Sequence, residues 1–226
     1  MTRRSLLSAG AAAATVALIV GCTAMGPSSG NPMSFFVTSA NPGKGGDLGG
    51  LAGADRFCQS LATSAGAGDR TWRAYLSTEA MDGQPAVNAR DRIGAGPWTN
   101  AKGVVVATSV ADLHGANAKV GKDTSLTEKG DVVSGFGDPV NRHDILTGSR
   151  PDGTLAMPAP GKDTTCGNWT RSEGGSAMVG HHDHKGTNPD PVANASWNSS
   201  HGTRGCSIDQ LKASGSAGLM YCFATR

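Results

Sequence analysis

The chain has 226 residues, of which 33 are glycine, 5% are aromatic and 17% are charged. Residues 1–21 hold two of its 20 basic residues and none of its 18 acidic ones, so a chain without them carries 18 of each sign and has no electrostatic reason to bind nucleic acid. So many glycines with so few aromatic residues favour long loops and a modest core, which in an exported protein usually relies on cross-links.

The N-terminus has the pattern of an export signal. Arg3 and Arg4 precede an apolar run that extends to Val20. This run is too short for a membrane span and ends in small residues, which predicts a signal peptide at residues 1–21. The sequence IVGC at its end resembles a bacterial lipobox, in which cleavage before the cysteine leaves Cys22 N-terminal and lipid-modified. We therefore expect a protein that is lipid-anchored to a bacterial cell envelope, on the periplasmic or the outer surface; the alternative is an ordinary signal peptide with an unrelated cysteine.

The rest of the chain divides into a tether and one domain. Residues 22–34 are small and polar with glycine and proline, which predicts a flexible tether. Residues 35–226 have the size of one ordinary domain. Within it, residues 35–38 are a short apolar strand candidate, and apolar positions between 51 and 65 follow helical spacing that places Cys58 on the buried face of a helix.

Further strands are expected where apolar side chains alternate. Residues 71–77 and 218–224 both alternate between two faces, and residues 103–108 indicate a third, weaker strand. In the second segment the expected faces are Leu219, Tyr221 and Phe223 on one side, with Met220 and Cys222 on the other. Most of 110–205 shows no period, and a loop region of that length is normally either functional or disordered.

Four cysteines remain besides Cys22: Cys58, Cys166, Cys206 and Cys222. An even number in an oxidising compartment predicts two disulfides, and three pairings are open. A metal site would need closely spaced pairs such as C-x-x-C, and a nucleophile would need a free thiol. Neither condition is met, so all four cysteines are expected to be structural.

Several motifs in order along the chain resemble one family. The first motif, residues 45–77, reads GGDLGGLAGADRFCQSLATSAGAGDRTWRAYLS and leads from a glycine-rich entry through G-A-D to a helical cysteine and a strand. Four shorter motifs follow in the second half: ILTGSRPDGTL at 145–155, CGNWT at 166–170, SWNSSHGTRGC at 196–206 and LMYCF at 219–223. Together they resemble endostatin, the C-terminal domain of certain collagens, and the bacterial endostatin-like or lectin-like lipoproteins. The match covers most of 35–226, with insertions in the middle and between Gly180 and Ser196.

This resemblance implies an α+β, C-type-lectin-like fold. Two helices would pack on a twisted, mainly antiparallel sheet, with a long glycine-rich loop region above it. It also implies a nested pairing of the cysteines, Cys58 with Cys222 and Cys166 with Cys206 inside it. Endostatin's zinc ligands lie near its N-terminus, and residues 33–38 supply no such histidine set.

A histidine-rich stretch, VGHHDHKG at 179–186, is the strongest candidate for metal chemistry. Imidazoles and a carboxylate are ligands for divalent metals. His182 and His184, with Asp183 between them, are the favoured candidates because alternate positions of an extended chain point the same way. The alternative is a polar surface loop without a metal. No motif in the sequence predicts a cofactor, and a divalent metal is the one candidate.

A sugar could be held by aromatic side chains. The calcium motifs of C-type lectins are incomplete here, because Gln84-Pro85-Ala86 and Trp197-Asn198-Ser199 lack the acidic ligands. Trp169 and Trp197 could still stack on a sugar ring, with Asn198 and His201 beside them, although tryptophans are as readily packed in a core.

No sequence motif of a known enzyme class is present, so we expect a protein that is not an enzyme. The leading hypothesis is a binding module that recognises a glycan or an extracellular-matrix-like protein through its loop region, with a membrane anchor and no nucleic-acid partner. The alternatives are a structural envelope lipoprotein and a metal-dependent hydrolase centred on residues 181–184. The sequence indicates no oligomeric state.

Overall fold

A computed structural model of the full chain describes residue 1, residues 31–157 and residues 162–225. The predicted signal peptide, the lipobox with Cys22 and most of the tether lie outside the described residues. The end of the tether packs on the domain, because Met33 is fully buried and the Asn31 side chain donates a hydrogen bond to the carbonyl of Ala65. Within the described residues, no helix combines the length and the apolar character that a membrane crossing requires.

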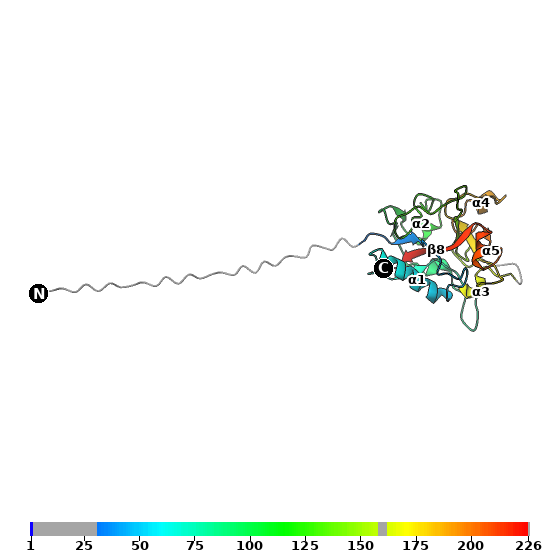
Figure 1. The fold of residues 1–226 in the computed structure, drawn as a ribbon, viewed down its shortest axis with the longest axis horizontal. Coiled ribbons are helices and arrows are strands. Elements are labelled where there is room, and N and C mark those ends of the chain that lie inside the picture. The colour runs from blue at the N-terminus through cyan, green and yellow to red at the C-terminus, as the bar shows by residue number, and fades with distance from the viewer. Residues whose placement is uncertain (2–30, 158–161, 226) are drawn as a thin grey trace.

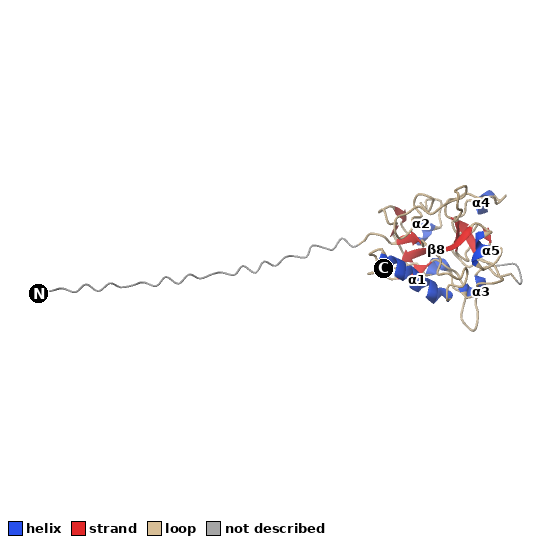
Figure 2. Ribbon diagram, in the orientation of Figure 1, coloured by secondary structure: helices blue, strands red, loops and turns tan. Residues whose placement is uncertain are grey.

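The centre of the domain is a six-stranded sheet (Figures 1 and 2). Its strands are β1 (Phe35–Val37), β2 (Trp72–Ala74), β5 (Asp144–Leu146), β6 (Met178–His181), β7 (His201–Gly202) and β8 (Ser216–Ala224). The order is β1-β8-β5-β6-β7, and β2 also pairs with β8. Only the pairing of β5 with β8 is parallel within this sheet, which is therefore mainly antiparallel. A second sheet consists of β3 (Trp98–Thr99) and β4 (Val105–Ala107).

The helices are few and mostly short. They are α1 (Gly50–Ser64), α2 (Val110–Leu113), α3 (Cys166–Trp169), α4 (Pro191–Asn194) and α5 (Ile208–Lys212), with a 3-10 turn, η1 (Ala89–Asp91). The described part of the chain thus holds one long helix and four helices of four or five residues, where the resemblance implied two. The predicted helix between 51 and 65 is α1, and Cys58 lies on its buried face.

The alternating pattern of β8 separates two hydrophobic cores. Met220 and Cys222 lie in the first core, against α1, whereas Leu219, Tyr221 and Phe223 lie in the second, with Leu113 of α2. The predicted faces are confirmed, and α1 and α2 lie on opposite sides of β8 in Figure 1. Full burial of a large apolar side chain contributes about 1.5–3 kcal/mol, so these two cores use the chain's few aromatic residues where they stabilise most.

Both disulfides have the nested pairing that the resemblance implied. Cys58 of α1 is bonded to Cys222 of β8, and Cys166 to Cys206. The glycine-rich entry to α1 crosses the inner disulfide, because a Cβ on Gly46 would lie 2.6 Å from Sγ of Cys166. Only a residue without a side chain can approach the sulfur so closely.

One carboxylate connects the G-A-D motif to the following strand. Asp55 of α1 accepts hydrogen bonds from the main-chain N–H of Ala74 at 2.9 Å and from the guanidinium of Arg73 at 2.6 Å. Arg92 donates to both oxygens of the same carboxylate, at 2.8 and 2.7 Å. Asp55 thereby fixes α1 against β2 and against the segment that follows η1.

Candidate functional site

A polar cavity of about 670 Å³ lies at the β6–β7 edge of the main sheet. Four segments of the chain line it, 136–143, 181–189, 201–204 and 212–215. Two of its lining residues are exposed cations, Arg204 and Lys212, and none of its lining residues in the described chain is acidic. Three of these four segments belong to the region 110–205, which showed no period in the sequence.

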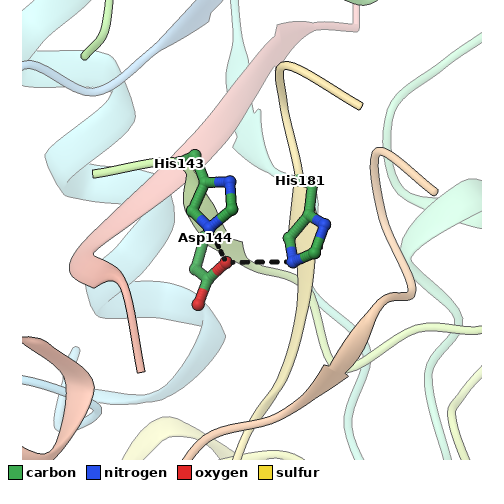
Figure 3. Close-up of side chains that lie close together, drawn as sticks. All are labelled: His143, Asp144 and His181. Carbon is green, nitrogen blue, oxygen red and sulfur yellow. Dashed lines mark ion pairs between the residues drawn. The ribbon is translucent and has the colours of Figure 1, made fainter. Parts of the chain in front are cut away.

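Three buried side chains lie close together beside this cavity (Figure 3), and two of them, His143 and His181, line it. Asp144 begins β5 and pairs in register with His181, the last residue of β6, while His143 directly precedes β5. The carboxylate Oδ1 of Asp144 lies 3.1 Å from Nε2 of His143 and 3.4 Å from Nε2 of His181. The three side chains are almost fully buried, with 3%, 0% and 1% exposure for His143, Asp144 and His181.

A third imidazole faces the other oxygen of the same carboxylate. Nε2 of His201, at the start of β7, lies 3.4 Å from Oδ2 of Asp144, and its ring contacts that of His181 edge to face. This side chain is 31% exposed and lines the cavity. His201 therefore stands between the buried cluster and solvent.

Each imidazole is held by its Nδ1 atom. Nδ1 of His143 donates to the carboxylate of Asp183 at 3.1 Å, and Nδ1 of His181 donates to the carbonyl of Asn194 at 2.7 Å. Nδ1 of His201 lies 3.2 Å from the carbonyl of Gly202. These contacts orient the rings so that all three Nε2 atoms converge on Asp144.

The convergence leaves polar atoms without hydrogen bonds. Both carboxylate oxygens of Asp144 and Nε2 of His181 are buried and make no hydrogen bond with any described residue. Buried polar atoms are nearly always paired, so such a set calls for a specific explanation. Ser216 donates only to the main-chain carbonyl of Asp144, at 2.7 Å.

The local environment shifts the pKa of several of these groups. Burial lowers the pKa of His181. Contact with the Asp144 carboxylate raises the pKa of His201 and outweighs the effect of burial. Burial would raise the pKa of Asp183, but the hydrogen bonds from His143 and from the Phe136 main-chain N–H at 2.6 Å lower it well below its ordinary value. Asp183 is thus a charged acceptor that fixes the His143 ring.

The donor set is suited to a metal ion. Two imidazoles and a carboxylate, with one ligand atom each, lie within 4.8 Å of one another. Zn²⁺ and other first-row transition ions prefer such nitrogen and oxygen ligands. Among the described residues, His143, Asp144 and His181 are the group that could hold one.

The structure places the metal-binding candidates chosen from the sequence outside this group of three. His182 points away from the cluster, with its Nε2 3.4 Å from the carbonyl of Ser134. Both ring nitrogens of His184 face main-chain carbonyls, those of Ala195 and Val120. The extended chain ends with His181, and His184 lies in a turn with a φ of 59°, so the expected alternation does not continue. The stretch is also no surface loop, because His181, His182 and Asp183 are buried.

Three of the four sugar-binding candidates are core residues. Trp169 is fully buried and donates to the carbonyl of Ser77 at 2.8 Å. Trp197 is 7% exposed and packs against Tyr221, and the amide of Asn198 is 1% exposed and donates to the Tyr75 hydroxyl at 2.9 Å. These three residues therefore pack in the core. The fourth candidate, His201, does line the cavity.

Sequence reasoning missed His143 and Asp144. They lie in the segment RHDIL, where His143 directly precedes the short strand β5 and Asp144 begins it. A His-Asp pair at the start of a strand could have pointed to these residues. The pairing of β5 with β6, which brings the pair to His181, is not indicated by the neighbouring sequence.

Comparison with models of known protein families gives no match for this chain, and comparison with curated proteins finds no similar sequence. The resemblance to endostatin therefore rests on the motifs alone.

Proposed function

We propose that this chain is an exported, lipid-anchored binding module of the endostatin-like group, with a C-type-lectin-like fold, and that its cavity binds an acidic glycan. The nested disulfides, the mainly antiparallel sheet and the order of the motifs support the fold assignment. The lipid anchor is supported by the lipobox-like sequence before Cys22. The fold by itself does not identify a ligand, so the ligand is argued from the cavity.

The charge of the cavity lining is the observation that carries this proposal. Arg204 and Lys212 are exposed at the cavity, His201 lines it as well, and none of its lining residues in the described chain is acidic. A guanidinium binds carboxylate or sulfate groups through paired, charge-assisted hydrogen bonds. An anionic group on the ligand thus has partners here, although the chain as a whole carries almost no net charge.

The remaining lining residues suit a sugar. Asn141, Thr187, Asn188 and Ser214 offer amide and hydroxyl groups that can donate to and accept from sugar hydroxyls. Phe136 is an aromatic residue with 40% exposure, and its ring can cover the apolar face of a sugar ring. Phe136 takes the role that the sequence had suggested for the two tryptophans.

A metal-dependent hydrolase is the second candidate. The buried His143, Asp144 and His181 cluster beside an open polar cavity favours it, because catalytic metal sites combine three protein ligands with a position open to substrate. Under this alternative the 181–184 stretch contributes only His181 as a ligand. Turnover of the bound glycan, followed by chromatography of the reaction mixture, distinguishes hydrolysis from binding.

A glycan array tests the proposed function. The full chain, purified in detergent, is applied to neutral glycans and to glycans with uronate, sialate or sulfate groups. We expect binding to the acidic set, and an Arg204→Ala variant should lose about 10- to 100-fold in affinity, the effect of one charge-assisted contact of about 1.5–3 kcal/mol.

The matched control is Arg56→Ala, which removes an exposed arginine of α1 that does not line the cavity. Its affinity should equal that of the original chain. Equal binding of neutral and acidic glycans, or equal affinities for the two arginine variants, would contradict the proposal. Absence of binding to every glycan would favour the structural envelope role instead.

A further inference from the structure

The Asp144 carboxylate lacks hydrogen-bond donors although it is fully buried. Its two oxygens and the Nε2 atom of His181 make no hydrogen bond with any described residue. Burying a charged group without partners is costly, so a folded protein normally supplies donors or a cation. Imidazole nitrogens and a carboxylate oxygen are together the ligands that transition-metal ions prefer, and imidazole nitrogens are the atoms that lie close to this carboxylate.

The hydrogen bonds made by Nδ1 of His143 and His181 determine whether the Nε2 atom that faces Asp144 carries a proton. A carbonyl or carboxylate can only accept, so Nδ1 of His181 carries a proton for Asn194 and Nδ1 of His143 carries one for Asp183. In a neutral ring, Nε2 then presents its lone pair. Two such Nε2 atoms then lie 3.1 and 3.4 Å from one carboxylate oxygen, and a positive ion among the three atoms would offset the repulsion between them.

The distances fit such an ion. With metal–nitrogen and metal–oxygen bonds of about 2.0–2.1 Å in a tetrahedral zinc site, two ligand atoms are separated by about 3.3 Å. The Asp144 Oδ1 atom lies 3.1 Å from Nε2 of His143 and 3.4 Å from Nε2 of His181. We infer that His143, Asp144 and His181 bind one first-row transition metal ion, with Zn²⁺ as the expected occupant.

The surroundings have the features of a metal site beyond its ligands. The Asp183 carboxylate and the Asn194 carbonyl hold the two imidazoles by Nδ1, the arrangement that fixes tautomer and orientation in many zinc proteins. Asp183 is in turn held by the main-chain N–H of Phe136. Asp183, one of the ligand candidates expected from the sequence, is in this geometry a positioning residue.

The ion has space and a route. Gly215 lies against the cluster, and a Cβ there would be 3.2 Å from both Oδ2 of Asp144 and Nε2 of His143. Any side chain at this position would therefore crowd the ligands. His143 and His181 both line the cavity, so the ion is reached from solvent through it. His201 faces the second oxygen of Asp144 and positions that carboxylate from the cavity side.

This inference goes beyond the proposed function, since it stands on the buried cluster and not on the ligand of the cavity. The test therefore uses the metal alone. The full chain is stripped with EDTA, freed of chelator and titrated with zinc sulfate by calorimetry, and the bound metal is counted by mass spectrometry. Co²⁺ is then added in place of Zn²⁺, because the visible absorption of Co²⁺ reports tetrahedral coordination.

We expect one Zn²⁺ per chain and a tetrahedral Co²⁺ spectrum. The variants His181→Gln and Asp144→Asn should each lower the affinity at least 100-fold, and Asp183→Asn should lower it 10- to 100-fold, the range found for residues that hold a metal ligand. The matched control is His182→Gln, the adjacent buried histidine that faces Ser134, for which affinity should change less than threefold. Near-UV circular dichroism confirms that each variant is folded.

A folded, stripped chain that binds neither Zn²⁺ nor Co²⁺ would overturn the inference. So would binding that His181→Gln and Asp144→Asn leave unchanged, because the ion would then lie elsewhere. Binding lost in His182→Gln and kept in His181→Gln would return the site to the residues chosen from the sequence. Glycan binding can fail while the metal titration succeeds, and the reverse also holds, so the two proposals are separable.

Discussion

Removal of the outer disulfide tests how this loop-rich domain is stabilised. The bond between Cys58 and Cys222 joins residues 164 positions apart, and that between Cys166 and Cys206 joins residues 40 apart. In the chain-entropy relation, closing loops of these lengths raises the free energy of unfolding by about 5 and about 4 kcal/mol. A single domain has a total of about 5–15 kcal/mol, so the outer bond alone accounts for a large part of it.

The perturbation is the double variant Cys58→Ala with Cys222→Ala, compared with Cys166→Ala and Cys206→Ala. We expect the outer variant to be largely unfolded at 37 °C and the inner variant to be folded but weakened. Guanidinium titration at 15 °C, followed by tryptophan fluorescence and far-UV circular dichroism, gives the free energies of unfolding. The fluorescence reports on buried tryptophans of both cores, such as Trp72 and Trp98.

The free energy of unfolding that the outer variant loses tests the chain-entropy argument. Cys58 and Cys222 are fully buried between α1 and β8, so their replacement also removes packing in the first core. A loss below about 1.5 kcal/mol for the outer variant would refute the chain-entropy argument, since it would mean that α1 and β8 hold together without the bond.

Three further predictions concern single side chains. Asp55→Ala leaves the guanidinium of Arg92, whose side chain is 10% exposed, without its carboxylate, and urea titration should show a loss of about 3–5 kcal/mol. Burial lowers the pKa of His114 below its ordinary 6.5, and the Nε2 atom of the neutral ring accepts a hydrogen bond from the Tyr75 hydroxyl at 2.7 Å. The stability that the neutral ring contributes is complete above pH 6.5 and is lost as the pH falls toward the lower pKa of the folded state. The difference in free energy of unfolding between the original chain and His114→Gln should therefore shrink between pH 7.5 and 5. Phe136→Ala should weaken glycan binding roughly 2- to 10-fold by calorimetry, the effect expected of one aromatic stacking contact; an unchanged affinity would remove Phe136 from the proposed site.

The parts of the fold with a local period could be predicted from the sequence. In α1 and in β8 the apolar residues that pack in the cores are close together in the sequence, so their spacing predicts a helix and a strand directly. The cysteine pairing came from the resemblance, since three pairings were compatible with the residues alone. The number of helices was wrong, because helices of four or five residues leave too short a pattern to read.

The site could be predicted only in part, because its residues meet through long-range pairing. β5 has three residues and β6 has four, too few for a period, yet their register places Asp144 opposite His181. The choice of His182 and His184 assumed that an extended chain continues beyond β6. The burial of Trp169 and Trp197 depends on contacts with distant parts of the chain, which their polar sequence neighbours do not indicate.

The loop region around the cavity is ordered by polar contacts instead of a large apolar core. Asp183 receives hydrogen bonds from the main chain of Phe136 and from the ring of His143, while the ring of His181 binds the main chain of Asn194, so three loops are tied to two adjacent strands. Two of these bonds hold His143 and His181, which face Asp144, and Asp144 belongs to β5, which pairs directly with the disulfide-bonded β8. A cation at Asp144 would therefore connect the cavity-lining histidines to β5, and through β5 to the strand β8 that carries the outer disulfide. The proposed ion would neutralise the buried carboxylate and would also link the loops that line the cavity to the sheet.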